Sequence, residues 1–162
     1  MKFKGLIHTF PLYVKNFIAA FVVVLSVGYG TGLLFVGETR AHTPQGMEEN
    51  YLGNETVAEA KVMKFKKGER EMLTLLHTHI LSISFIFFLL GGLVSITSIP
   101  KSWKSFLMIE PFFSIILTFG GIYFLWKGIL WMKWVVMFSG IVMTSVFLLS
   151  ALLILFQLYK KK

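Results

Sequence analysis

Residues 72–99 read MLTLLHTHILSISFIFFLLGGLVSITSI, and this run of 28 residues contains no Asp, Glu, Lys or Arg. As an α-helix the run would be about 42 Å long, which exceeds the ~30 Å hydrocarbon core of a bilayer. An isolated segment in lipid satisfies its backbone hydrogen bonds only as a helix. The run therefore predicts a membrane-spanning helix that is longer than the membrane requires.

Three further apolar runs of at least 20 residues flank this one, at residues 17–36, 106–126 and 134–159. The whole chain is 56% hydrophobic and only 15% charged, whereas about a quarter of the residues in a soluble domain are charged. The period-two alternation of a membrane β-barrel is absent from these runs. We therefore predict an all-α integral membrane four-helix bundle, with residues 1–162 forming a single membrane domain.

Positive charge gathers at the ends of these runs, and the formal net charge is +8. Four spans would place most of the flanking lysines on one face: Lys2, Lys4, Lys15, Lys101, Lys104, Lys160, Lys161 and Lys162. Short loops rich in Lys and Arg stay in the cytoplasm. Both termini are therefore predicted to be cytoplasmic, with residues 38–71 as the outer loop. Lysines in these positions anchor helices, so the charge does not indicate nucleic-acid binding.

The outer loop is the only sizeable segment outside the predicted spans. Residues 39–54 are rich in Pro, Gly and Asn, which favours irregular structure. Residues 55–67 are expected to form a short helix that Gly68 ends. Glu69 and Glu71 suit the first turn of the next helix, because its positive dipole end attracts carboxylates.

His77 and His79 lie inside the second apolar run. Ionisable residues within a span are costly, which makes both candidates for function. Residues i and i+2 of a helix differ by about 200°, so the two cannot ligate one metal from a regular helix. His77 shares a stripe with Ser84 and Gly91 and is expected to face other helices. His79 shares a stripe with Ile86 and is expected to face lipid or a partner subunit, so His77 is the better interior ligand.

Haem or metal ligation is one interpretation of these histidines. A b-type haem in a membrane bundle is held by histidines on different helices, but the other three predicted spans contain none. The second ligand would come from His79, from His42 in the outer loop, or from another subunit. Copper is an alternative, since Met47, Met63 and Met72 lie on the same side as the histidines. A third interpretation needs no cofactor: the histidines hydrogen-bond to other helices or to lipid headgroups.

Glu110 is the only carboxylate inside an apolar run, and Pro111 follows it. An intramembrane carboxylate can serve as a proton relay. We favour a structural role, in which Glu110 pairs with Lys104 or Lys101 near the cytoplasmic interface or sits at a kink made by Pro111.

Glycines in three of the runs predict close helix contacts, because small residues let helix backbones approach each other. The first run contains a G-x-x-x-G pattern, and the second and third contain glycine pairs. The residues are Gly28 and Gly32, Gly91 and Gly92, and Gly120 and Gly121.

The segment His77-Thr78-His79-Ile80-Leu81 resembles the His-x-His helix motif of small bacterial membrane proteins distantly similar to haem-copper oxidase and nitric-oxide-reductase core subunits. In that superfamily such histidines ligate haem or copper, although this chain lacks the other ligand helices. The stretch from Glu49 to His79 also resembles uncharacterised four-helix inner-membrane proteins of Bacteroidetes-type bacteria. The residues that carry this second resemblance are Glu-Asn-Tyr-Leu-Gly-Asn-Glu and Lys-Phe-Lys-Lys-Gly-Glu-Arg-Glu, both within this stretch. This second resemblance implies a multi-pass protein of the bacterial inner membrane, without a known activity.

Two functional hypotheses follow. In the first, the protein is a haem- or metal-associated accessory subunit of a respiratory or electron-transfer system, with His77, His79 and His42 as ligands. In the second, it is a non-catalytic membrane scaffold or assembly subunit without a cofactor. Both predict contact with the bilayer and with other membrane subunits, and neither requires the chain to be an enzyme.

Overall fold

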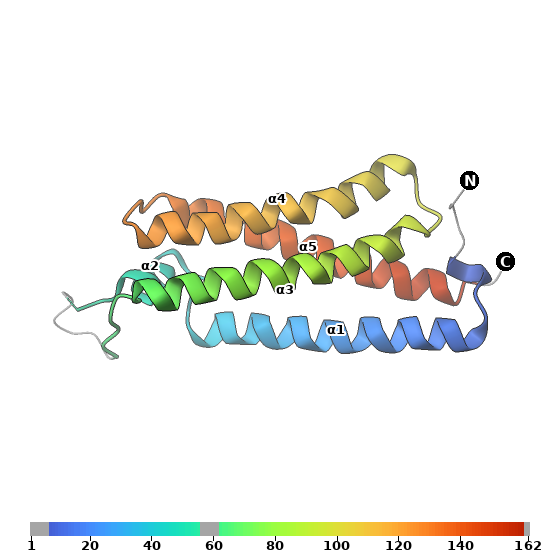
Figure 1. Cartoon of the computed structure of the whole chain (residues 1–162), viewed down its shortest axis with the longest axis horizontal. Helices are drawn as coiled ribbons and strands as arrows, with labels where there is room; N and C mark the ends of the chain where they lie inside the picture. Colours follow the sequence, from blue (N-terminus) through green and yellow to red (C-terminus); the bar gives the residue numbers. More distant parts are fainter. Residues whose placement is uncertain (1–6, 56–61, 161–162) are drawn as a thin grey trace.

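The structure is a computed structural model that describes residues 7–55 and 62–160. Its elements are a 3₁₀ turn η1 (Ile7–Thr9) and five helices, α1 (Leu12–Glu38), α2 (Pro44–Leu52), α3 (Glu69–Ser95), α4 (Lys101–Trp126) and α5 (Met132–Leu158) (Figure 1). These residues form no strand. The predicted all-α class is confirmed. Four of the lysines that carried the orientation argument, Lys2, Lys4, Lys161 and Lys162, lie outside the described residues.

Four of the helices, α1, α3, α4 and α5, are long and apolar enough to cross a membrane. Each has 26 or 27 residues, which corresponds to about 40 Å. The predicted four-helix membrane bundle is confirmed, and α3 is longer than a ~30 Å hydrocarbon core requires, as predicted; the other three spans are about as long. Helix α3 ends at Ser95 rather than at Ile99, because Thr97 Oγ1 donates to the Val94 carbonyl and closes the helix end.

The two ends of the bundle differ in what they carry (Figure 1). One end holds η1, the α3–α4 turn and the end of α5, and Ser98 there donates from its backbone N and its Oγ to Gln157 Oε1 at 2.7 and 2.9 Å. The other end holds α2, the loop after it and the α4–α5 turn. The start of α1 and the end of α5 therefore lie at the same end of the bundle, as an even number of spans requires.

Close packing of α4 on α5 forms the centre of the bundle. Thr118 Oγ1 and Ser139 Oγ lie 2.7 Å apart in this buried contact. A Cβ atom at Gly121 would lie 2.7 Å from Val136 Cγ2, so the interface leaves no room for a side chain there. Gly91 also meets a neighbour, since its Cβ would lie 3.7 Å from Met108 Cγ on α4.

The remaining predicted glycine contacts are wrong. A Cβ atom would meet nothing within 4 Å at Gly28, Gly32, Gly92 or Gly120. At α1, larger side chains make the contact with α5, so its glycines do not need to approach another helix. The Tyr29 ring stacks on Phe147 of α5 at 3.9 Å between centroids, and its hydroxyl lies 3.2 Å from Thr144 Oγ1. Phe147 also meets Phe87 of α3 edge-on at 6.2 Å.

The outer segment is more ordered than predicted. Residues 44–52 form α2, where irregular structure was expected. Thr43 supplies the reason: its side chain accepts from the Gly46 backbone N at 3.0 Å, and Pro44 follows at the first helical position. A short helix was expected over residues 55–67, but residue 55 and residues 62–67 are not helical; the residues between them lie outside the described ranges. Glu69 and Glu71 occupy the first turn of α3 as predicted.

Helix α2 and residues 62–68 are here called the cap. Polar contacts hold the cap against α4 and α5. Glu48 forms an ion pair with Lys133, and Trp126 Nε1 donates to the Lys67 carbonyl at 2.8 Å. Tyr51 is buried in the cap, and this burial raises the pKa of its phenol to about 12, with a hydrogen bond from Asn50 acting in the opposite direction. The phenol is therefore uncharged at neutral pH.

The contact at Gly121 makes a direct test of the α4–α5 packing. We expect Gly121→Leu to lower the free energy of unfolding by about 1–3 kcal/mol, because its side chain would overpack the interface. The control is Gly120→Leu, whose Cβ meets nothing within 4 Å and whose effect should stay within about 0.5 kcal/mol. Denaturant titration of both variants in detergent measures the difference. Equal stability of the two variants would contradict this packing.

The Trp126 hydrogen bond predicts how firmly the cap is held. Trp126→Phe removes the N–H that reaches Lys67, and a hydrogen bond worth about 1 kcal/mol corresponds to roughly fivefold more frequent opening. Limited digestion with trypsin should therefore cleave after Lys66 and Lys67 about fivefold faster. Trp131→Phe is the matched control, since Trp131 is 60% exposed. Identical cleavage rates in the two variants would show that Trp126 does not hold the cap.

Candidate functional site

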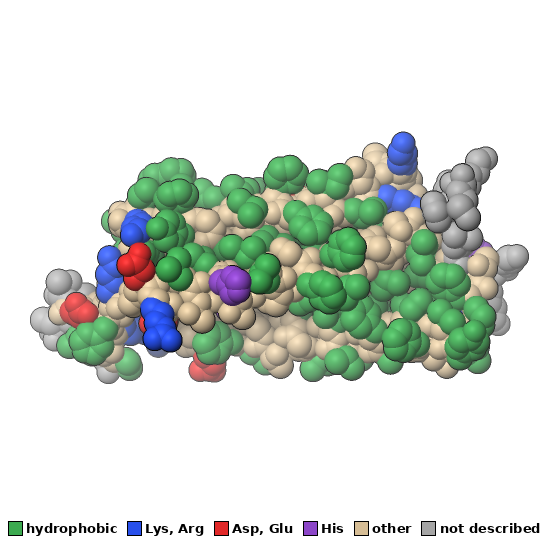
Figure 2. All heavy atoms as spheres, in the orientation of Figure 1, with side chains coloured by type: hydrophobic (Ala, Val, Ile, Leu, Met, Phe, Trp, Pro, Cys, Tyr) green, Lys and Arg blue, Asp and Glu red, His purple; other side chains and the backbone are tan. Residues whose placement is uncertain are grey.

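The half of α3 nearest α2, which was predicted to be the outer half, contains both His77 and His79. Gly68 precedes the helix, and the charged residues of its first turn end at Glu71. His77 follows six residues later, which is about 9 Å along the helix axis. Most of α3 is exposed at the surface of the bundle, and Figure 2 shows a histidine at the surface over this helix.

His77 and His79 lie on opposite sides of the buried stripe of α3. That stripe consists of Met72, Phe87, Leu90, Gly91 and Val94. At about 100° per residue, His77 lies roughly 100° from the centre of this stripe in one direction and His79 roughly 60° in the other. His77 is exposed, so the prediction that it faces the bundle interior is wrong. The large side chains of the stripe, rather than the small polar ones, determine which face is buried.

His79 is the histidine that contacts a neighbouring helix. Its ring centroid lies 5.5 Å from that of Phe119 on α4, although the residue as a whole is exposed. His79 Nδ1 lies 2.8 Å from the Leu75 carbonyl oxygen. A carbonyl only accepts, so this contact assigns the proton to Nδ1 and leaves the lone pair on Nε2. Ligand histidines are commonly oriented by such a hydrogen bond to a carbonyl.

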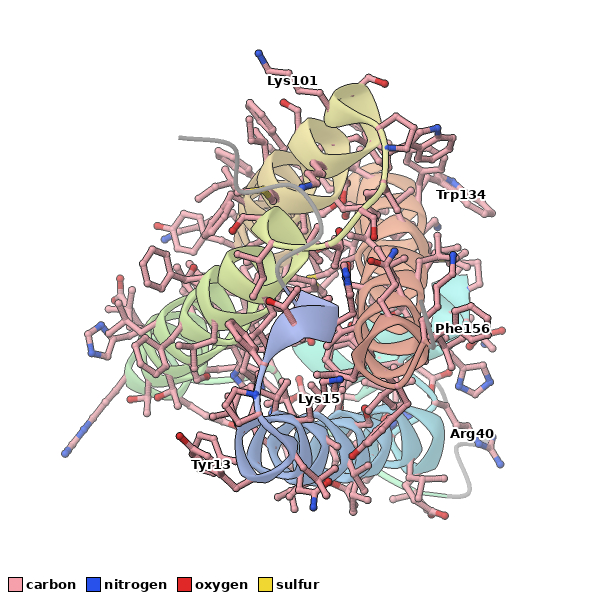
Figure 3. The ribbon with its side chains drawn as sticks, turned by 90° about the vertical axis from the view of Figure 1, so that its right-hand side faces the viewer. Tyr13, Lys15, Arg40, Lys101, Trp134 and Phe156 are labelled. Carbon is pink, nitrogen blue, oxygen red and sulfur yellow. The ribbon has the colours of Figure 1, made fainter. Side chains whose placement is uncertain are left out.

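His42 does not join the other two histidines. It is exposed in the turn between α1 and α2. Figure 3 shows Arg40, two residues earlier, projecting on the side of the bundle away from α3. Over residues 7–55 and 62–160, no group of three or more His, Cys, Asp or Glu side chains is placed to hold a metal ion.

The methionines of the copper interpretation are divided between two environments. Met47 and Met72 are 4% and 0% exposed and belong to the hydrophobic core, whereas Met63 is 55% exposed. The two buried thioethers therefore have a packing role in the cap and at the start of α3.

Glu110 is a separate polar position, near the opposite end of α4. Its Oε1 accepts from Ser114, and its buried Oε2 has no hydrogen-bond partner among the described residues. The expected pairing with Lys104 or Lys101 is wrong within the described part of the chain. Lys104 Nζ instead donates to the Ser95 carbonyl at 2.7 Å, because the last carbonyls of a helix lack partners within it. Helix α4 continues through Pro111.

Two long-range polar contacts at the end of the bundle that carries α2 were not predicted. They join Glu48 to Lys133 and Trp126 to Lys67, pairs that are 85 and 59 residues apart in the chain. Lys66 and Lys127 also lie over the Trp126 ring, at 5.3 and 4.6 Å from its centroid. The one signal available in the sequence was the number of lysines and tryptophans around residues 126–134.

Comparison with known proteins gives one match. A family model described as a transmembrane helical domain, Aq_1264_TM, matches residues 41–162, which include α2 to α5 and leave out α1. No curated protein and no solved structure matches the chain. The match gives no support to the resemblance to haem-copper oxidases. It covers three quarters of the sequence, and the chain therefore belongs to the Aq_1264_TM family of transmembrane helical domains.

Proposed function

We propose that this protein is a non-catalytic accessory subunit that docks other membrane subunits through the outer half of α3. The observation that carries the proposal is the exposure of His77 and Thr78 on the outside of a membrane-spanning helix. We further propose that the end bearing Lys15, Lys101 and Lys104 faces the cytoplasm of a bacterial cell, following the charge rule for short loops.

An exposed histidine about 9 Å beyond the last charged residue of its helix is costly in lipid. The nearby hydroxyls of Thr74 and Ser82 donate to the carbonyls of Arg70 and Thr78 in their own helix, and His77 makes no hydrogen bond to them within the described residues. A helix from a partner can supply a hydrogen bond to His77, and such interhelical bonds contribute about 0.6–2 kcal/mol. A partner subunit at this surface therefore accounts for the position of His77.

Haem or metal ligation remains a second candidate, and one observation favours it. The Nδ1 contact with Leu75 leaves Nε2 of His79 able to ligate. His79 is for this reason a better candidate than His77 or His42. The other two candidate ligands, His77 and His42, do not lie beside His79, so the second ligand would come from a partner subunit.

Docking through α3 predicts site-specific cross-links. A photoreactive amino acid at Leu81, one turn beyond His77, should cross-link to a partner membrane protein in intact cells. The same residue at Ile141 on α5 should not, although both positions are similarly exposed, at 58% and 64%. His77→Leu should reduce the Leu81 cross-link about fivefold, which corresponds to one interhelical hydrogen bond of about 1 kcal/mol. Equal cross-linking at both positions would rule out docking through α3.

The cofactor proposal predicts a spectrum. The complex purified in mild detergent from haem-replete cells should show a Soret band that His79→Ala abolishes. His42→Ala should leave the band unchanged, because this residue lies in the α1–α2 turn. A complex that contains the partner subunit but neither haem nor metal would exclude this candidate, while the cross-linking result would still decide the docking role.

A further inference from the structure

One edge of the chain segment that leads into α3 is held firmly by the cap. Asn54 is buried, and its side-chain Nδ2 donates to the Val62 carbonyl at 3.0 Å. Its Oδ1 accepts from the Lys64 backbone N at 2.6 Å, and its own backbone N donates to the Lys64 carbonyl at 2.9 Å. This segment is therefore a fixed part of the cap, and it lies outside the four long helices, beyond the first turn of α3 (Figure 1).

The hydrogen bonds of this segment alternate from residue to residue. Val62 and Lys64 direct backbone atoms toward Asn54. The backbone N and O atoms of Met63 and Phe65 form no hydrogen bond within the described residues. In an extended strand, successive residues direct their backbone groups to opposite edges. The pattern is therefore that of a short strand with one paired edge and one unpaired edge.

Large apolar side chains accompany the unpaired edge. Met63 is 55% exposed and Phe65 is 70% exposed, and residues two apart in a strand share one face. Lys64 belongs to the other face, where it is half-buried and its Nζ donates to the Thr39 carbonyl at 3.3 Å. An unpaired strand edge with exposed apolar side chains is a template for pairing with another chain.

Lipid does not account for this surface. An open strand edge is not stable in the hydrocarbon region, because its backbone groups find no hydrogen-bond partner there. Burial of the Met63 and Phe65 side chains in acyl chains would take the unpaired edge into the same environment. An extended segment of another protein satisfies the backbone groups and covers both side chains, which is the recognition mode called strand addition.

Charge indicates which kind of segment fits this edge. Lys64 and Lys66 form no ion pair within the described residues, whereas Lys67 pairs with Glu71 in the first turn of α3. A second copy that paired its Met63 with Phe65 would place Lys64 opposite the same residue of the first copy. Like charges directly opposite each other destabilise a sheet, and opposite charges stabilise it. A carboxylate opposite Lys64 therefore fits better than a second copy.

We propose that the edge formed by Met63 and Phe65 binds an extended segment of a partner subunit, in which a carboxylate lies between two apolar residues. The apolar residues pair with Met63 and Phe65, and the carboxylate lies opposite Lys64. This inference rests on the proposed docking function, because it specifies what the partner presents beyond the membrane-spanning helices of this chain.

The test measures binding of synthetic peptides to the full-length protein in detergent. The chain contains no cysteine, so Val62→Cys, on the face away from Met63 and Phe65, introduces a single site for a nitroxide label. Titration with the peptide Thr-Val-Glu-Val-Thr should slow the motion of the label. The same peptide with Lys in place of Glu should bind about fivefold more weakly. Methylation of the two valine nitrogens should weaken binding about fivefold for each hydrogen bond removed.

Substitutions in the labelled protein test the edge itself. Phe65→Pro removes one unpaired N–H and keeps the hydrogen bonds of Asn54, so it should weaken binding of the Glu peptide about fivefold. Unchanged tryptic cleavage after Lys66 would show that the cap remains intact. Phe65→Ser keeps the N–H, loses the ring, and should also weaken binding. The control is Leu130→Ser, an exposed apolar position at the same end of the bundle, which should bind as the unsubstituted protein does.

Several outcomes would overturn the proposal. Equal binding of the three peptides, or unchanged binding in both Phe65 variants, would show that the edge does not add a strand. A nitroxide on Phe65→Cys that oxygen reaches in phosphatidylcholine vesicles, and a water-soluble nickel chelate does not, would place the segment in lipid. Spin–spin broadening of the same label would show pairing of two copies.

The cross-link at Leu81 separates this inference from the docking function. A Leu81 cross-link without peptide binding would refute strand addition and leave docking through α3 in place. Peptide binding without a Leu81 cross-link would support the strand edge and rule out docking through α3.

Discussion

Hydrocarbon offers no partner for a backbone amide, so each span must satisfy its own hydrogen bonds as a helix. Polar side chains in the spans follow the same constraint. Ser26, Ser82 and Ser145 donate to carbonyls four residues earlier in their own helices. Only a few hydroxyls are then left to join helices, as at Thr118–Ser139 and Tyr29–Thr144. Helix association depends mainly on the fit of apolar side chains, which is tightest between α4 and α5.

The same constraint explains which features were predictable from sequence. Four apolar runs of sufficient length can cross lipid only as helices, so the spans and the all-α class could be predicted from composition. Helix α2 lies outside the spans, where loop-like composition concealed the Thr43–Pro44 start signal. The face occupied by His77 was predicted wrongly because small residues were taken as the packed side. The bulk of Phe87, Leu90 and Val94 decided it instead.

Sequence reasoning found the histidines but not their surroundings. Which of the two meets another helix depends on where α4 places Phe119, and no pattern within α3 contains that information. The cap was hidden for a similar reason, since Glu48–Lys133 and Trp126–Lys67 join segments far apart in the chain. Contacts of this kind depend on how the helices are assembled. The apolar space lined by Phe21, Phe87 and Met108 was hidden in the same way, because only the arrangement of α1, α3 and α4 brings these residues together.

Phe147 is the one side chain of α5 that is seen to touch an aromatic ring on each of two other spans, Tyr29 on α1 and Phe87 on α3. It therefore acts as a spacer, whose width sets how far apart those two helices stand. Phe87 also lines the apolar space between α1, α3 and α4, so part of the wall of that space packs against a ring of α5. A smaller residue at this position would leave both rings without their contact on α5, so the arrangement of α1 and α3 depends on a side chain that belongs to neither helix.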